Sequence, residues 1–185
     1  MKLLEAGADV SVSVGDAGGA LLWAVSDPAN LEIVTMLLEA GADVNARPYS
    51  TALIEALRPN PYYGRISDPN PEIIAVLLKY GANVNARDAN NMTALRMAIN
   101  SNTLEVIAML LKAGADANAG CVWSGMTPLM EAALRASPEV IIAMLEAGAD
   151  ANARDNDGRM AIDYARYNPN LANTDAFRRL EAASR

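Results

Sequence analysis

The chain has 185 residues, of which 52% are apolar and 20% are charged, and its formal net charge is −7. The acidic balance disfavours nucleic acid as a partner because phosphates require a basic surface, and no apolar run approaches the roughly eighteen residues that a membrane span needs. The chain has no histidine and one cysteine, so the usual general acid–base residue is missing and an intramolecular disulfide is impossible.

A short motif recurs five times along the chain. Two apolar residues are followed, after two further positions, by glycine and alanine, as in LLKAGA at residues 110–115. The five glycines are Gly7, Gly41, Gly81, Gly114 and Gly148. Their numbers differ by 34, 40, 33 and 34. A nearly fixed period in this range predicts a repeat solenoid, in which successive copies stack on one another.

Each copy of the motif predicts the end of an amphipathic helix. Glycine at this position is typical of a left-handed C-cap, because only glycine adopts positive φ without a Cβ clash. Upstream of four glycines lies a capping residue that is followed two positions later by glutamate. These capping residues are Asn30, Asn70, Thr103 and Ser137. We therefore expect helices of about three turns, each begun by a side chain that accepts a hydrogen bond from a free helix amide.

A second recurring group lies between each glycine and the next capped helix. It is an alanine-containing apolar stretch that is most regular in TPLMEAA. The five groups cover residues 19–25, 51–57, 93–99, 127–133 and 160–166. A threonine cap and a proline at the first helical position predict a short helix. The small alanines of that helix let the longer helix approach closely.

The succession of Gly-Ala-Asp-Val-Asn-Ala, a turn, Thr-Pro-Leu, alanines and a capped helix resembles the ankyrin repeat over essentially the whole chain. The resemblance implies an all-α repeat solenoid in which each repeat has a β-hairpin finger and a helix-turn-helix. The finger is most regular at residues 154–159. The histidine that the family usually has after Thr-Pro-Leu is absent, and its replacements are Leu22, Ile54, Arg96, Met130 and Asp163. We expect these replacements to affect stability more than function.

The repeats are predicted to form one ankyrin-repeat domain, residues 1–185. It divides into an incomplete N-terminal repeat at 1–15, full repeats at 16–47, 48–89, 90–123 and 124–156, and a capping repeat at 157–185. The second full repeat carries an inserted loop at 58–70, which we expect to be ordered at the surface because it is rich in proline.

The first predicted helix lacks its beginning, so we expect further natural sequence upstream. Apolar side chains of the next repeat should then be incompletely covered, and the chain should fray or self-associate at that end. These side chains are Leu21, Val25, Ile33 and Leu37.

The core is expected to be the apolar face of the longer helices. Its predicted members are Ile33, Val34, Leu37, Leu38, Ile73, Ile74, Leu77, Leu78, Val106, Ile107, Leu110, Leu111, Val140, Ile141, Met144 and Leu145. Burial of each such side chain stabilises the fold by about 1.5–3 kcal/mol. No single repeat is expected to be stable alone.

The sequence offers little material for catalysis or metal binding. Cys121 has apolar neighbours and no histidine to activate it, which favours a bystander thiol over a nucleophile. Asp155, Asp157 and Gly158 partly match a calcium-binding loop, but the terminal glutamate is absent, so a turn is the preferred interpretation. We therefore expect no enzyme activity, no cofactor and no metal.

The resemblance implies that a partner protein binds along a concave surface made by the fingers and the short helices. The residues expected to face it from the short helices are Trp23, Glu55, Met97, Glu131 and Tyr164. The candidates at the finger tips are Arg47, Tyr49, Asn90, Met92, Val122, Trp123, Met126, Asn156 and Arg159. A second candidate patch on the inserted loop comprises Tyr62, Tyr63 and Arg65. The two glutamates would steer a basic or amphipathic partner.

The aromatic candidates have alternative interpretations. Trp23 either binds a partner or covers the incomplete end, and Trp123 either binds a partner or packs against the neighbouring finger. The inserted loop either presents its tyrosines or folds back onto its own helices.

The sequence thus predicts a protein–protein interaction module with no catalysis of its own. Two alternatives stay open, namely a regulatory or inhibitory segment of a larger multidomain protein and an enzyme with an unrecognised site. The identity of the partner is not predicted, because a fold does not determine a function. The cytoplasm is the favoured compartment, although an upstream targeting segment would change this expectation.

Overall fold

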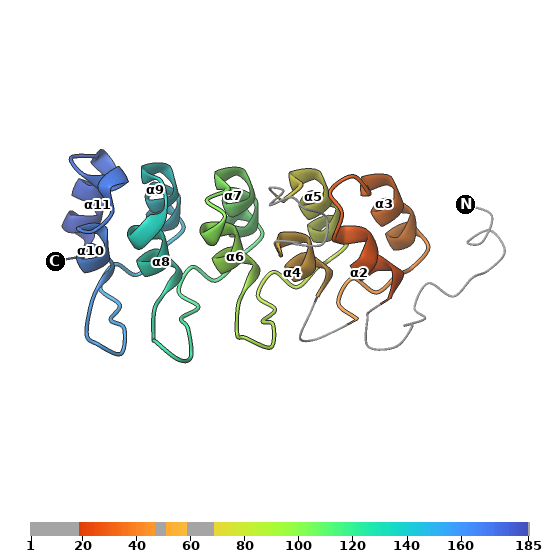
Figure 1. The fold of residues 1–185 in the computed structure, drawn as a ribbon, viewed down its shortest axis with the longest axis horizontal. Coiled ribbons are helices and arrows are strands. Elements are labelled where there is room, and N and C mark those ends of the chain that lie inside the picture. Colours follow the sequence, from red (N-terminus) through yellow and green to blue (C-terminus); the bar gives the residue numbers. More distant parts are fainter. Residues whose placement is uncertain (1–18, 47–50, 59–68, 185) are drawn as a thin grey trace. The chain divides into compact units, whose positions relative to one another are not determined.

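The computed structural model describes residues 19–46, 51–58 and 69–184. The chain forms two compact units, residues 1–89 and 90–185. The described residues contain ten α-helices and one 3₁₀-helix, and no β-strand lies among them (Figure 1). The predicted all-α repeat fold is confirmed, and the described fingers are turns without strand residues. The organisation as a single domain stays a prediction.

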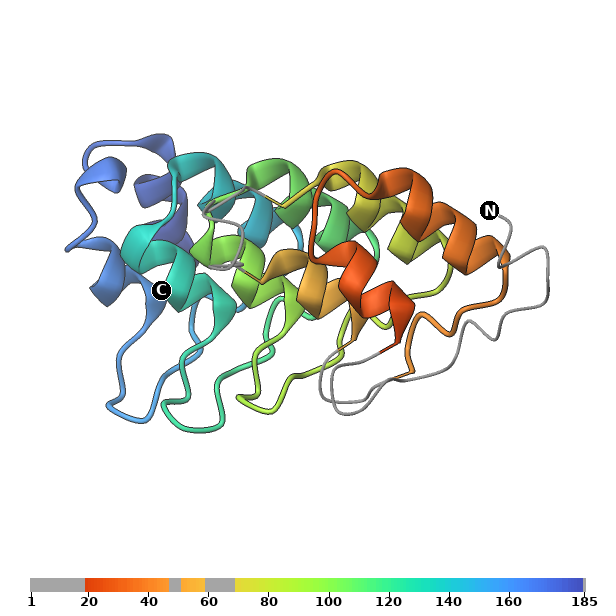
Figure 2. The same cartoon turned by 45° about the vertical axis from the view of Figure 1, so that its right-hand side comes forward.

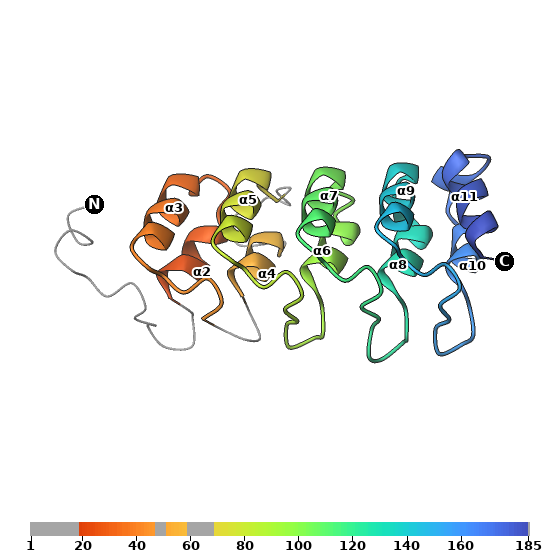
Figure 3. The same cartoon turned by 180° about the vertical axis from the view of Figure 1, so that it is seen from behind.

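The first unit contains two helix pairs. Helix α2 spans Ala20–Val25, α3 spans Leu31–Glu39, α4 spans Ala52–Leu57 and α5 spans Pro71–Lys79. The short helices α2 and α4 contact each other, and so do the longer helices α3 and α5. Each short helix also packs on the longer helix that follows it. The two kinds of helix therefore form two rows, which Figure 3 shows from behind.

The second unit contains three such helix pairs. Helix α6 spans Ala94–Asn100, α7 Leu104–Lys112, α8 Pro128–Arg135, α9 Pro138–Glu146, α10 Ala161–Ala165, the 3₁₀-helix η3 Pro169–Leu171 and α11 Asp175–Ala183. The short helices α6, α8 and α10 contact one another in that order, as do the longer helices α7, α9 and α11. The fingers that precede α8 and α10 project on the same side of these rows (Figure 2). Among the helices that the structure describes, none combines the length and the apolar character needed to cross a membrane.

The glycines end the longer helices as predicted. Gly114 has φ +88, its N–H donates to the carbonyl oxygen of Leu111 at 3.0 Å, and the N–H of Ala115 donates to that of Leu110 at 2.9 Å. This pair of bonds is a Schellman cap, which satisfies two free carbonyl groups at the helix end. Gly41, Gly81 and Gly148 have the same positive φ and the same bonds. The fifth predicted glycine, Gly7, lies outside the described residues.

The predicted caps at the helix starts form only in part. Asn70 accepts a hydrogen bond from the amide two residues later at 2.9 Å, and the threonine caps of three short helices also form. These threonines are Thr51, Thr93 and Thr127. The prediction is wrong for Asn30, Thr103 and Ser137, whose side chains accept no cap bond. Asn30, for example, has φ −91 and ψ 25 rather than extended backbone. Its side-chain Nδ2 donates instead to the carbonyl oxygen of Ala24 in α2.

Asparagine side chains join successive repeats within the second unit. The Nδ2 of Asn118 donates to the carbonyl oxygen of Gly148 at 3.2 Å, and its Oδ1 accepts from the N–H of Asp150 at 2.8 Å. Asn152 bonds in the same way to the carbonyl oxygen of Ala183. Each asparagine therefore holds the end of the next longer helix, and the first unit has the same link at Asn45.

The core follows the predicted face of the longer helices with a few exceptions. Leu77, Leu110 and Met144 are fully buried, whereas the second leucine of three pairs is only partly buried. These are Leu78, Leu111 and Leu145. A residue one step further along a helix is rotated by about 100°, which places these leucines at the edge of the buried face.

The first described helix pair, α2 and α3, differs from the predicted burial in two ways. Ile33 was expected in the core but is 50% exposed, because no described helix precedes this pair and packs on α3. Ile33 was also one of four side chains that were expected to be incompletely covered. That expectation is confirmed for Ile33 and is wrong for the other three, which are buried. They are Leu21, Val25 and Leu37.

Candidate functional site

Two neighbouring fingers of the second unit make up the candidate site. We call residues 120–126 the Trp123 finger and residues 154–160 the Asn156 finger. In the Trp123 finger, the N–H of Cys121 donates to the carbonyl oxygen of Met126 at 2.8 Å, and the N–H of Gly125 donates to that of Cys121 at 2.8 Å. These two bonds close the finger into a tight turn just before α8.

Asn156 joins the two fingers. Its backbone N–H donates to the carbonyl oxygen of Ser124 at 3.0 Å, and its Nδ2 donates to that of Trp123 at 3.0 Å. Gly125 makes this approach possible, because it has φ +70 and a Cβ at that position would lie 2.7 Å from the Oδ1 of Asn156. The backbone of the Trp123 finger is therefore fixed on both sides of the tryptophan.

Val122 and Trp123 point their side chains into solvent from this fixed turn. Val122 is 71% exposed and Trp123 is 81% exposed. The alternative that Trp123 packs against the neighbouring finger is therefore wrong for its indole ring, although its carbonyl group does bond to that finger. Together the two side chains form an exposed apolar protrusion at the tip of the turn.

The Asn156 finger is organised by Asp155. The Oδ1 of Asp155 accepts from the N–H groups of Asp157 and Arg159, each at 2.9 Å, and its Oδ2 accepts from the hydroxyl of Tyr164. The Tyr164 bond is the main cause that lowers the pKa of Asp155 and raises the pKa of Tyr164. Both oxygens of this carboxylate are therefore occupied by hydrogen bonds. No group of three or more potential metal ligands occurs among the described residues.

Arg159 belongs to the Asn156 finger, and Tyr164 adjoins that finger from α10. Tyr164 is only partly exposed, and its hydroxyl is already bonded to Asp155. The Arg159 guanidinium lies 6.0 Å from the centre of the Tyr164 ring and 3.2 Å from a carboxylate oxygen of Asp157. Five of the predicted site residues therefore lie in or next to the two joined fingers, namely Val122, Trp123, Asn156, Arg159 and Tyr164.

The expectation that Met97 and Glu131 face a partner is wrong. Met97 is buried, and Glu131, on α8, is buried in an ion pair with Arg96 of α6. The Nε of Arg96 donates to the Oε2 of Glu131 at 3.1 Å, and its Nη2 donates to the Oε1. Both carboxylate oxygens are thus occupied, so Glu131 has no role in steering a basic partner.

In the first unit, Trp23 is exposed. Glu55 is partly exposed, and its carboxylate lies 3.1 Å from the guanidinium of Arg58, which also contacts Asp88 at 3.3 Å. A charge that is already paired attracts a partner less strongly than a free one. Both interpretations of Trp23, a partner contact and a cover for the incomplete end, stay predictions.

Eight predicted site residues remain, and three of them lie among the described residues. Met92 and Met126 are partly exposed and Asn90 is exposed. The candidates that lie outside the described residues are Arg47, Tyr49, Tyr62, Tyr63 and Arg65. The expected order of the inserted loop, and its two interpretations, therefore stay predictions, as does self-association at the N-terminal end.

The sequence did not predict the polar contacts that surround Cys121 in the Trp123 finger. The thiol of Cys121 interacts with the hydroxyl of Ser124 and with the guanidinium of Arg96, and these contacts lower its pKa to about 7 against the opposing effect of burial. The only signal in the sequence was Arg96 itself, the one charged residue in the mostly apolar helix α6.

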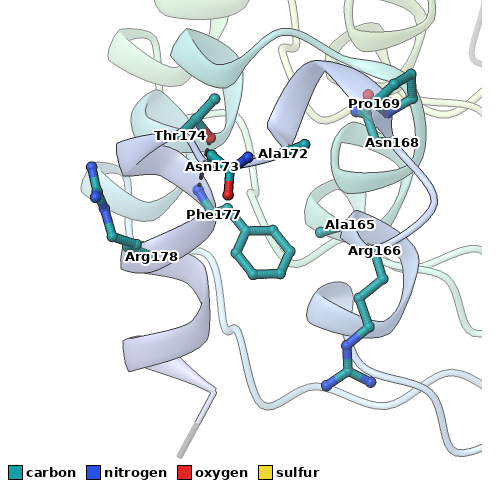
Figure 4. A pocket seen from close by; sticks show the side chains of 9 residues that line it. All are labelled: Ala165, Arg166, Asn168, Pro169, Ala172, Asn173, Thr174, Phe177 and Arg178. Carbon is teal, nitrogen blue, oxygen red and sulfur yellow. Dashed lines mark hydrogen bonds between the residues drawn. The ribbon is translucent and has the colours of Figure 1, made fainter.

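A pocket of about 420 Å³ lies at the other end of the unit, between α10, η3 and α11. The Phe177 ring faces Ala165 across it, with the arginines Arg166 and Arg178 beside them (Figure 4). Arg166 is paired with Asp163 at 3.2 Å. The residues that line the pocket include no carboxylate or thiol, and the Thr174 hydroxyl is used in hydrogen bonds to the backbone of Leu171 and Phe177.

Comparison with known proteins supports the repeat pattern. The family model described as ankyrin repeats (3 copies) matches residues 21–121 and 63–155, which together cover well over half of the chain. No curated protein matches the chain. The matched residues include the four Schellman-capped glycines and the whole Trp123 finger, and they end at Asp155, just before Asn156. The chain therefore belongs to the ankyrin repeat family.

Proposed function

We propose that this chain binds a partner protein through the Trp123 finger, with the Asn156 finger as its support. Ankyrin repeats are generally protein–protein interaction modules, and the family is typically non-enzymatic. The observation that carries the proposal is the exposure of Val122 and Trp123 side by side on a turn whose backbone is bonded to the next finger.

Physical chemistry supports Trp123 as the anchor of such an interface. Tryptophan is enriched among the few residues that each contribute about 2 kcal/mol or more to binding, because it buries a large area and orders few torsions. A fixed backbone also lowers the entropy that is lost on association. The bonds from Asn156 therefore favour binding even though Asn156 need not touch the partner.

The partner that fits this site has an apolar pocket for the indole ring. Glu131 is buried and Glu55 is ion-paired, so these two residues do not support the basic partner that was expected from the sequence. Near the Trp123 finger, Arg159 is balanced by Asp157. We propose that apolar contact determines the affinity, while the net charge of −7 affects the rate of association.

A capture experiment tests this proposal. The purified chain is immobilised and compared with the variant Val122→Ser/Trp123→Ser, and Tyr167→Ser serves as the control because Tyr167 is also an aromatic residue of the second unit and is 80% exposed. Proteins retained by the wild type and by Tyr167→Ser should be lost from the double variant, with at least a tenfold weaker Kd for a purified partner. Equal retention by all three chains would exclude the Trp123 finger as the binding surface.

A further inference from the structure

The pocket between α10, η3 and α11 has a volume of about 420 Å³ and is lined by no residue of the Trp123 finger or the Asn156 finger. Pockets that bind small molecules in proteins have volumes of about 300–1,000 Å³. This pocket is therefore large enough for a small organic molecule, and a ligand in it leaves the proposed partner contact at the Trp123 finger undisturbed.

The inner part of the pocket is apolar. The Phe177 ring faces Ala165 across it (Figure 4), and Pro169 and Ala172 add apolar atoms to the lining. Ala165 is buried and has a short side chain, so the space in front of the phenylalanine ring stays open. A flat aromatic group can enter this space and pack on Phe177, either offset or edge to face, as aromatic pairs prefer.

The rim of the pocket carries positive charge. Figure 4 shows Arg178 on one side of the Phe177 ring and Arg166 on the other. No carboxylate belongs to the residues that line the pocket, although the whole chain has a net charge of −7. A ligand with a negative charge is therefore favoured at this position over a neutral or a cationic one.

The two arginines differ in their ion pairs. Arg166 lies 3.2 Å from a carboxylate oxygen of Asp163, whereas Arg178 forms no ion pair with any residue that the structure describes. The planar guanidinium of an arginine can bind a carboxylate through two parallel hydrogen bonds. The side-chain amide of Asn173 lies near the Phe177 ring (Figure 4) and is a second donor. Arg178 and Asn173 are therefore the groups available to an incoming carboxylate.

We propose that this pocket binds a small aromatic carboxylate. The ring of the ligand packs between Phe177 and Ala165, and its carboxylate accepts hydrogen bonds from the Arg178 guanidinium and the Asn173 amide. Both parts of the ligand are needed, because the ring supplies the apolar contact and the charge supplies a partner for Arg178. Arg178 and Ala172 are exposed, so solvent screens the charge and the affinity is modest. A ligand of about eleven non-hydrogen atoms should bind with a Kd of roughly 1 mM.

The first experiment titrates the ¹⁵N-labelled chain with 3-phenylpropionate and follows the backbone amides by NMR. Two controls separate the parts of the ligand, since 3-phenylpropionamide keeps the ring without the charge and propionate keeps the charge without the ring. We expect saturable shifts confined to the amides of residues 165–178, with both controls binding at least about threefold more weakly. No saturable shift at concentrations well above 1 mM, shifts centred elsewhere, or equal binding of the neutral amide would overturn the proposal.

The second experiment tests the assigned residues. Arg178→Gln removes the charge at the rim, and Arg179→Gln is the matched control because Arg179 is the next residue of α11, pairs with Asp175 at 2.7 Å and does not line the pocket. Ala172→Trp fills the pocket from an exposed position, so the fold should be kept, as circular dichroism can verify.

Arg178→Gln should raise the Kd for 3-phenylpropionate about threefold, Ala172→Trp should abolish binding, and Arg179→Gln should bind like the wild type. Unchanged binding by Arg178→Gln, or saturable binding at the same amides by a folded Ala172→Trp chain, would show that the ligand site has been assigned wrongly. Capture of a partner by the Trp123 finger should be the same in all three variants, so this inference and the proposed function fail independently.

Discussion

Arg96 and Glu131 form a buried ion pair that joins the short helices α6 and α8. The Nε of Arg96 donates to one carboxylate oxygen of Glu131 at 3.1 Å, and its Nη2 donates to the other. The two residues are separated by one repeat in the sequence and are both almost fully buried. Because both side chains are removed from water, each charge is stabilised mainly by the other.

Removal of one partner should be far more costly than removal of both. Glu131→Ala leaves the Arg96 charge buried without a counter-ion, which should lower the free energy of unfolding by about 3–5 kcal/mol. Arg96→Leu/Glu131→Leu replaces the pair with apolar side chains and should change stability by less than about 2 kcal/mol. Urea unfolding followed by circular dichroism measures both, and a double variant as unstable as Glu131→Ala would refute this account.

Tyr164→Phe should destabilise the Asn156 finger in a way that depends on pH. The hydroxyl of Tyr164 is the main cause that lowers the pKa of Asp155. A depressed carboxyl pKa stabilises the fold above the ordinary value of 3.8, and this stabilisation is lost as pH falls through the native pKa.

The wild type should therefore melt at a higher temperature than Tyr164→Phe at pH 7, and the two melting temperatures should converge below about pH 3.8. Thermal unfolding between pH 2 and pH 7 checks this. Arg166→Gln is a suitable control, because Arg166 is an exposed residue next to α10 and its replacement leaves the Asp155 carboxylate untouched. A constant difference between wild type and Tyr164→Phe at every pH would contradict the prediction.

Gly125→Ala should disturb the Trp123 finger more than Gly158→Ala disturbs the Asn156 finger. Both glycines have positive φ, +70 and +78, so each substitution carries a backbone cost of about 1–2 kcal/mol. Only Gly125 has a close neighbour, since its added Cβ would lie 2.7 Å from Asn156 whereas nothing lies within 4 Å of the same position at Gly158. The comparison therefore isolates the contact between the fingers.

The readouts for the glycine pair are the melting temperature and the emission of Trp123, measured in a Trp23→Phe background because Trp23 also emits. Gly125→Ala should break the bonds to Asn156, change the environment of the indole and reduce partner capture. Gly158→Ala should show the smaller stability loss only. Equal effects of the two substitutions on Trp123 emission would mean that Asn156 does not hold the Trp123 finger.

The parts of the fold that were predictable from the sequence are those set by local chemistry. Gly114 ends its helix because positive φ is required there, and Thr127 caps α8 because its hydroxyl is three residues from a free amide. The caps at Asn30 and Thr103 failed although their residue types were suitable. Their ψ angles are 25 and 87 rather than extended, and the residue type alone does not determine that backbone path.

The parts that were not predictable depend on contacts between repeats. Glu131 was assigned to the surface by its position in the repeat, but Arg96 lies 35 residues earlier and neutralises it. Asn156 was predicted to face a partner from a finger tip, but its side chain bonds to the carbonyl oxygen of Trp123, a contact that spans 33 residues. Trp123 itself was a candidate because a tryptophan in a turn has little core to enter, and that local argument does not depend on the partner repeat.

Leu110→Ala tests whether the longer helices form the core of the second unit. Leu110 is completely buried in α7, so its truncation removes apolar contact and leaves a cavity that the neighbouring helices fill only in part. The free energy of unfolding should fall by roughly 2–5 kcal/mol. Leu104→Ala is the matched control on the same helix, because Leu104 is 38% exposed and its truncation should cost well under about 2 kcal/mol. Urea unfolding of both variants gives the comparison. A loss below about 1 kcal/mol for Leu110→Ala, or equal losses for the two leucines, would mean that the buried face of α7 has been placed in the wrong phase.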